Sequence, residues 1–203
     1  MFSLAKTGAI TAMLVPVVLV ATAIGFGLAI PEFSQWRHPL TLLGATGVPH
    51  AMAYSLLGLV LPGLLALYSG VSVLASNPSR MLRIGLLMTV LSGVAFAAMG
   101  LLPLDPSDLN GRASQYHASA WLLWALASVI GTGWLGLSLR QHANGLALSG
   151  LSIAIALLIG MLSFFPPSHW LPAPFTQRLA FAAWALWWPA LIRLWPNPKC
   201  GTL

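Results

Sequence analysis

Charged residues are scarce in this sequence. Only 6% of its 203 residues are charged, whereas 58% are hydrophobic. A soluble globular domain carries about 25% charged residues, and these help to cover its water-facing surface. This chain has too few charges for that purpose, and we therefore predict that lipid covers much of its surface.

Clustered charge is also missing, and the sequence has a single cysteine. The formal net charge is +6, but the basic residues stand singly and form no run of Lys or Arg. A surface that follows nucleic-acid phosphates needs such a cluster, so we predict no nucleic-acid partner. The one cysteine, Cys200, excludes an intramolecular disulfide and a cysteine-based metal motif. The sequence also has no phosphate loop and no Gly-x-Ser-x-Gly elbow.

Long apolar stretches dominate what is present. A helix needs about 20 apolar residues to cross a bilayer. We predict helices over residues 9–30, 51–74, 84–102, 118–139, 146–165 and 179–194. The predicted fold class is all-α: a polytopic membrane helix bundle of about six transmembrane helices in one domain, residues 1–203. The first stretch exceeds the roughly 7–15 apolar residues of a signal peptide, so we expect it to be retained.

Prolines punctuate these stretches. The first, third and fifth stretches each end at a proline, which stops a helix because it lacks the amide hydrogen and clashes with the preceding turn. Pro16, Pro62 and Pro189 instead lie inside stretches. A membrane helix tolerates such a proline when neighbours satisfy the freed carbonyl, so we expect kinks there rather than breaks.

Basic residues are divided unequally between the two sides that this topology defines. The side with both termini holds six of them, and the other side holds three, Arg37, Arg112 and Arg178. An excess of Lys and Arg marks the cytoplasmic side, so we predict an inner-membrane protein with both termini in the cytoplasm. The acidic residues and four of the five histidines fall on the outer side: Glu32, Asp105, Asp108, His38, His50, His117 and His169.

Asp105, His117 and His50 are the candidate catalytic and metal-binding residues within this outer set. Asp105 and His117 are separated by eleven residues, which can fold back and bring them together. His50 and His117 precede the second and fourth predicted helices, so their imidazoles could face one another. Histidine and carboxylate bind divalent metals and perform general acid–base catalysis. The sequence leaves the cofactor unassigned. A divalent metal is the first candidate, and a haem is less favoured because both histidines lie near the membrane surface.

Ordinary turn chemistry is the competing interpretation of the same residues. A histidine at a helix end often caps the helix or bonds to water and lipid headgroups. Asp105 and Asp108 flank Pro106 and precede Gly111, a composition typical of turns. No spacing matches a metal motif such as His-Glu-x-x-His, so the sequence leaves both interpretations open.

A repeated segment suggests three similar helical hairpins. His50-Ala-Met-Ala-Tyr54 opens the second predicted helix, and His117-Ala-Ser-Ala-Trp121 opens the fourth. Arg178-Leu-Ala-Phe, at the start of the sixth, is a weaker echo. The alternative is that apolar helices resemble one another by composition alone.

Short motifs along the chain resemble a known family. Leu102-Pro-Leu-Asp105 followed by His117-Ala-Ser-Ala resembles the proline–aspartate and downstream histidine of the bacterial and archaeal membrane family called DUF998. The runs Leu43-Gly-Ala-Thr-Gly-Val-Pro49 and Gln177-Arg-Leu are similar to its second and last segments. The family more often has Phe where this chain has Leu102. The resemblance implies a six-helix membrane topology, and it implies no reaction because the family's function is unknown.

Three functions fit these features. A small accessory or scaffold subunit of a membrane complex fits the short inner connections and the lack of ionisable residues inside the predicted helices, and its partners would be lipid and other membrane subunits. A membrane-embedded enzyme acting on lipid or metal at the outer leaflet fits the one-sided acids and histidines. A small carrier of an apolar or zwitterionic molecule would use the proline-containing helices. The sequence favours the first.

Overall fold

The computed structural model describes residues 2–167 and 169–196, and those residues form helices and connections with no strand. The α-helices are α1 (Phe2–Ala29), α2 (Ala51–Tyr54), α3 (Leu61–Leu74), α4 (Arg80–Leu101), α5 (Arg112–Leu139), α6 (Leu146–Phe164) and α7 (Ala173–Leu194). A π-helix, η2 (Ser55–Val60), joins α2 to α3 without a break. Short 3-10 turns occupy η1 (Leu40–Gly44) and η3 (Ala143–Gly145). The predicted all-α class is confirmed, and Lys199 and Cys200 lie outside the described residues.

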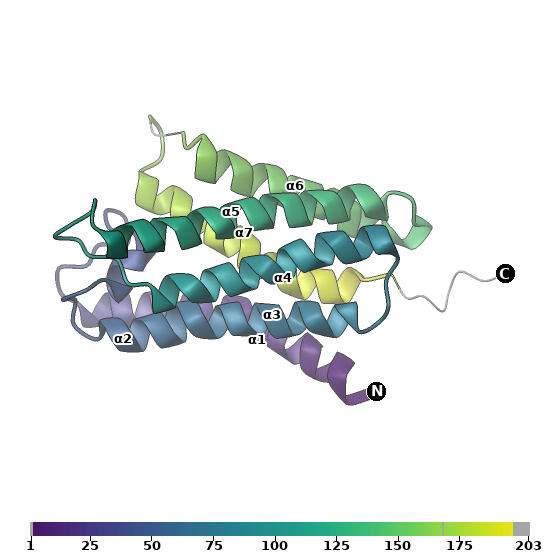
Figure 1. Ribbon diagram of the computed structural model, residues 1–203, viewed down its shortest axis with the longest axis horizontal. Helices are drawn as coiled ribbons and strands as arrows, with labels where there is room; N and C mark the ends of the chain where they lie inside the picture. The colour runs from purple at the N-terminus through teal and green to yellow at the C-terminus, as the bar shows by residue number, and fades with distance from the viewer. Residues whose placement is uncertain (1, 168, 197–203) are drawn as a thin grey trace.

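The helices form a bundle in which chain neighbours pack side by side (Figure 1). α1 packs on α3, α3 on α4, α4 on α5, α5 on α6 and α6 on α7, and α7 returns to α1 to close the ring. α1 begins and α7 ends at the same end of the bundle, which we call the terminal end. The opposite end carries the connections 30–50, 102–111 and 165–172, and we call it the long-loop end.

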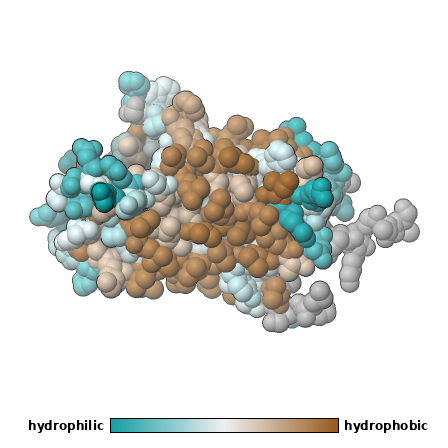
Figure 2. Space-filling model, viewed as in Figure 1, coloured by the Kyte–Doolittle hydropathy of each residue, from teal (hydrophilic) through white to brown (hydrophobic). Residues whose placement is uncertain are grey.

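On the face drawn in Figure 2, an apolar belt covers the middle of the bundle, between two polar ends. Five helices are long and apolar enough to cross a membrane: Lys6–Ala29, Ala51–Leu74, Arg80–Leu101, Arg112–Leu139 and Leu146–Phe164. The sixth long helix, α7, has 22 residues but carries Gln177, Arg178 and Arg193 near its ends. These features are consistent with a helical membrane bundle.

Several helices begin earlier than the sequence predicts. α5 begins at Arg112 rather than at residue 118, and α7 begins at Ala173 rather than at residue 179. α1 and α4 likewise start at Phe2 and Arg80, against predicted starts at 9 and 84. The extra turns contain polar residues, which an apolar-length criterion leaves out although they continue the helix.

The π-helix has a cause in the sequence. Pro62 is the second residue after η2, and proline has no amide hydrogen to donate to the carbonyl of Gly58 four residues earlier. The wider turns of a π-helix change the bonding pattern just before this gap. Two glycines allow the neighbouring backbone to lie close to η2. A Cβ on Gly100 would lie 2.6 Å from the carbonyl oxygen of Ser55, and a Cβ on Gly44 would lie 2.5 Å from Ser55 Oγ. Pro16 and Pro189 lie within unbroken α1 and α7.

Aromatic side chains from α4, α5 and α7 fill the centre of the bundle. Trp184 stacks on Phe96 with ring centroids 4.5 Å apart. Trp124 packs edge-on against Phe181 at 4.8 Å, and Trp188 packs edge-on against Trp184 at 6.1 Å. All five side chains are buried, and such aromatic pairs each contribute about 0.5–1.5 kcal/mol beyond the burial of their area.

Two tryptophan–serine hydrogen bonds attach α7 to its neighbours. Trp184 Nε1 donates to Ser92 Oγ on α4 at 2.9 Å, and Trp187 Nε1 donates to Ser152 Oγ on α6 at 3.0 Å. The remaining buried polar side chains in the described part of the chain are serines, threonines and His117, and none carries a fixed charge. The interior of the bundle is therefore mainly apolar and aromatic, and several of its polar groups join helices.

Candidate functional site

The predicted site residues all lie at the long-loop end. His117 is in the second turn of α5, where it is only 6% exposed. Its Nδ1 lies 2.8 Å from the carbonyl oxygen of Leu102, the residue that caps the C-terminus of α4. Because a carbonyl can only accept, Nδ1 carries the proton in this bond. His117 thus satisfies a carbonyl that the end of α4 leaves unpaired and joins the two helices.

Asp105 is held within its own turn. Its Oδ1 accepts hydrogen bonds from Ser107 N at 2.9 Å and from Ser107 Oγ at 2.6 Å. These bonds favour the charged carboxylate and hold the pKa of Asp105 below its usual value. Ser114 Oγ lies 3.0 Å from the carbonyl oxygen of Asp105 and 2.8 Å from that of Asp108, which closes the loop onto the first turn of α5.

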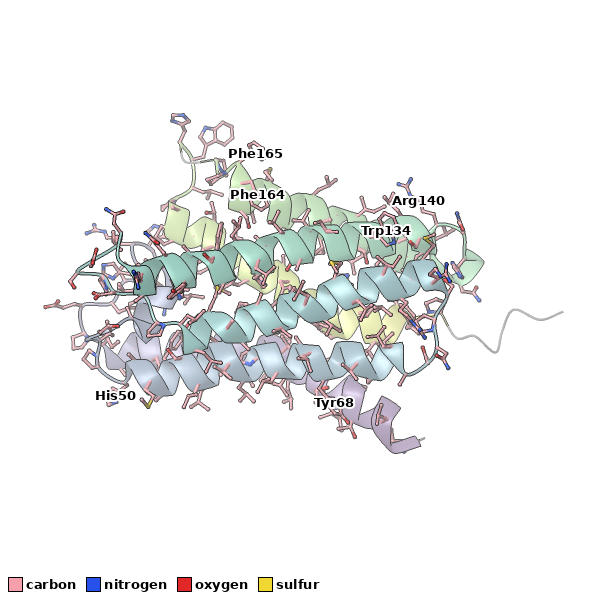
Figure 3. The ribbon with its side chains drawn as sticks, in the orientation of Figure 1. His50, Tyr68, Trp134, Arg140, Phe164 and Phe165 are labelled. Atoms are coloured by element: carbon pink, nitrogen blue, oxygen red, sulfur yellow. The ribbon has the colours of Figure 1, made fainter. Side chains whose placement is uncertain are left out.

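His50 stands at the start of α2 and is exposed. Figure 3 shows it at the long-loop end, while Trp134 and Arg140 lie at the terminal end. Its backbone has φ 61°, in the left-handed region, which a histidine adopts more readily than most residues. Its side chain makes no capping hydrogen bond, although its carbonyl accepts from Tyr54 N at 3.0 Å. His50 therefore forms the corner at which the connection enters the helix.

The three predicted site residues do not assemble into a metal centre. His117 is turned to Leu102, Asp105 to Ser107, and His50 lies outside the helix packing. Over residues 2–167 and 169–196, no three His, Cys, Asp or Glu side chains form a group that could hold a metal ion. The two histidines were predicted to occupy equivalent positions before their helices. In the structure His50 precedes α2, whereas His117 lies inside α5. A catalytic role for these residues stays a prediction.

Two glutamines that were not among the predicted site residues secure the longest connection. Gln35 Nε2 donates to the carbonyl of Ala23 on α1 at 2.9 Å, and Gln35 Oε1 accepts from Arg178 Nη2 on α7 at 3.1 Å. Gln177 Oε1 accepts from Leu40 N at 3.0 Å. The segment 30–44 is thereby fixed across the ends of α1 and α7. The two contacts with α7 join residues more than 130 positions apart, so no local pattern could have predicted them.

Three grooves open on the surface of the bundle. One of about 310 Å³ lies between α6 and α7 at the long-loop end and includes Trp121, Ser163 and Gln177. A second of about 440 Å³ follows the same two helices and includes Ile155 and Leu186. A third of about 410 Å³ borders η2. No titratable side chain from the described residues lines any of these three, so none offers an acid, base or metal ligand.

Comparison with known proteins gave no relative from which to transfer a function. No protein-family model matches this chain. No curated protein and no solved structure matches it either. The resemblance of its motifs to the DUF998 family remains a prediction, and the function must be argued from the geometry of this molecule.

Proposed function

We propose that this protein is a small accessory or scaffold subunit of a membrane complex, embedded in the cytoplasmic membrane with both termini in the cytoplasm. The observation that supports this most directly is the use of its polar groups. His117 and Asp105 bond within the fold, and the three grooves described above carry no titratable side chain. The proposed work of the protein is therefore to present surfaces to lipid and to other subunits.

The proposed orientation rests on the distribution of charge. The excess of basic residues belongs to the terminal end, which by the positive-inside tendency is the cytoplasmic one. The long-loop end, with the acidic residues, then faces outward. An outer-leaflet enzyme gains no support, because no three His, Cys, Asp or Glu side chains of the described residues form a group that could hold a metal ion. A small carrier gains none from the three grooves, because no titratable side chain lines them. The accessory role is preferred for these reasons.

In-membrane cross-linking tests the accessory role. A photo-reactive amino acid is placed in turn at one exposed apolar position on each long helix: Val17, Met52, Leu87, Leu137, Leu157 and Leu186. The accessory role predicts a discrete adduct with one or a few other membrane proteins, confined to positions on one side of the ring. Unirradiated cells provide the control. Adducts with lipid alone at all six positions would contradict the proposal.

A further inference from the structure

Arg178 carries a positive charge to the edge of the bundle at the long-loop end. It is the sixth residue of α7, so at about 1.5 Å per residue its Cα lies about 8 Å along the helix axis from the first residue. Its Nη1 donates to the carbonyl oxygen of Pro174 at 2.9 Å, one turn closer to that end. The side chain therefore extends towards the level of phospholipid headgroups, as arginines near membrane surfaces commonly do.

The guanidinium is held by neutral groups. Nε and Nη2 both donate to Gln35 Oε1, at 3.3 and 3.1 Å, and the group lies 5.9 Å from the ring centre of Phe33. Gln35 is itself oriented by its bond to Ala23. These contacts fix the position of the guanidinium without neutralising its charge.

The site has further capacity to bind. An arginine has five N–H groups. Three N–H groups of Arg178 donate hydrogen bonds within the described residues, so two N–H groups remain for a ligand. Behind it, the hydroxyl of Tyr54 is fully buried without a hydrogen-bond partner among the described residues, and the phenol and the guanidinium interact electrostatically. Glu32, in the same connection, is exposed and forms no ion pair with Arg178 within 4 Å.

The surroundings decide which anion fits. Residues of α1 beside the Gln35 contact are exposed and apolar, Leu28 at 81% and Ile24 at 52%, and Leu179 follows Arg178 on α7. Such a surface suits acyl chains. A planar guanidinium with free N–H groups matches the oxygens of a phosphate.

We propose that Arg178, positioned by Gln35 and Phe33, binds the phosphate of an anionic phospholipid in the leaflet at the long-loop end. This lipid site is independent of the accessory role proposed above. Gln35 acts as a positioning residue. Its bond to Ala23 holds its side chain in place, and its Oε1 in turn holds the guanidinium of Arg178, so Gln35 does not have to touch the lipid.

Lipid titration of the purified protein tests the site. The full chain in neutral detergent is titrated with phosphatidylglycerol, and bound lipid is counted by native mass spectrometry, with diacylglycerol as the phosphate-free probe. Arg178→Gln is expected to weaken phosphatidylglycerol binding about tenfold or more, as loss of a charge-assisted contact does. Arg112→Gln, at an exposed arginine of the same end, is the matched control and should bind like wild type.

Each other outcome has a defined meaning. Equal binding by wild type and Arg178→Gln would overturn the proposal, as would equal weakening in Arg112→Gln. Displacement of the lipid by an equimolar amount of inorganic phosphate would show a free-anion site instead. A changed co-purifying protein with unchanged lipid binding would assign Arg178 to a partner's carboxylate and overturn the lipid site. If Arg178→Gln does not purify folded, Arg178→Met, which keeps the apolar stem against Phe33, replaces it.

Discussion

At the scale of single residues, three buried polar side chains bond to groups that a helix end or a tryptophan ring would otherwise leave unpaired. His117 serves a terminal carbonyl, and Ser92 and Ser152 serve buried indoles. An unpaired buried donor or acceptor is costly, since water cannot replace the lost partner. The first three predictions follow from this use of polar groups.

The bond between Trp184 and Ser92 is open to a direct test. Ser92→Ala leaves the fully buried indole N–H of Trp184 without an acceptor, and we expect a loss of about 1–3 kcal/mol in the free energy of unfolding. Ser119→Ala, where an exposed hydroxyl bonds back to its own helix, should change stability by less than about 0.5 kcal/mol. Thermal unfolding in detergent measures both, and equal losses would contradict the assigned role.

The two candidate histidines should differ in their effect on stability. His117→Ala removes a buried side chain and unpairs the carbonyl of Leu102, so we expect a loss of about 2 kcal/mol or more. His50→Asn keeps a residue that tolerates the left-handed backbone and should be nearly neutral. Melting temperatures of the two variants decide the matter. A neutral His117→Ala would remove the structural role and revive the catalytic prediction.

Asp105 should make stability depend on acid pH. Its folded-state pKa is lowered by Ser107, so its contribution is fully present above the unfolded pKa of about 4 and is lost as the pH falls through the folded-state pKa. Wild type should therefore melt above Asp105→Asn at pH 7, and the gap should close as the pH falls below about 4. A gap that stays constant from pH 7 to pH 3 would show that the carboxylate charge has no part in it.

At the scale of helices, close approach depends on glycine at particular crossings. A Cβ on Gly63 of α3 would lie 2.5 Å from Ala97 N and 2.6 Å from the carbonyl oxygen of Gly93 on α4. Backbone atoms cannot move aside as a side chain can. We therefore expect Gly63→Ala to separate α3 from α4 and to destabilise the protein by about 1–3 kcal/mol.

Gly150 provides the matched control for this crossing. A Cβ there meets nothing within 4 Å, so Gly150→Ala should be neutral or should stabilise α6 by up to about 1 kcal/mol through helix propensity. Thermal unfolding of the two variants measures the difference. If both substitutions lowered stability equally, the close contact between α3 and α4 would not be the reason.

Sequence patterns predicted some elements better than others, for physical reasons. The second helix is predicted with its observed ends, 51–74, because its apolar run is bounded on both sides by turn residues. The first turns of α5 and α7 were missed, because polar residues near a membrane surface carry no apolar signal while remaining helical. The π-helix was missed as well, although Pro62 supplies its cause.

The candidate site was predicted less well than the fold. Residue type and side of the membrane identified His50, Asp105 and His117, but their bonding partners depend on how the 102–111 connection folds. The partners of Arg178 come from a segment far away in the chain. Such contacts arise from tertiary packing, and one sequence contains no periodic signal for them.

At the scale of the whole molecule, the bundle has an apolar belt on the face drawn in Figure 2. Its interior holds no fixed charge among the described residues. A charged path would need charged side chains in that interior, and the buried polar side chains of the described residues are serines, threonines and His117. The molecule is thus built to be stable within lipid and to offer long apolar helix faces. An accessory subunit needs those two properties.

The most direct test of the accessory role is the composition of the particle that leaves the native membrane. The full chain is tagged, expressed at its natural level, extracted in mild detergent and weighed by native mass spectrometry. The accessory role predicts a particle that contains at least one different membrane protein in fixed stoichiometry. A particle that contains this chain alone, in several mild detergents and in detergent-free lipid discs, would contradict it.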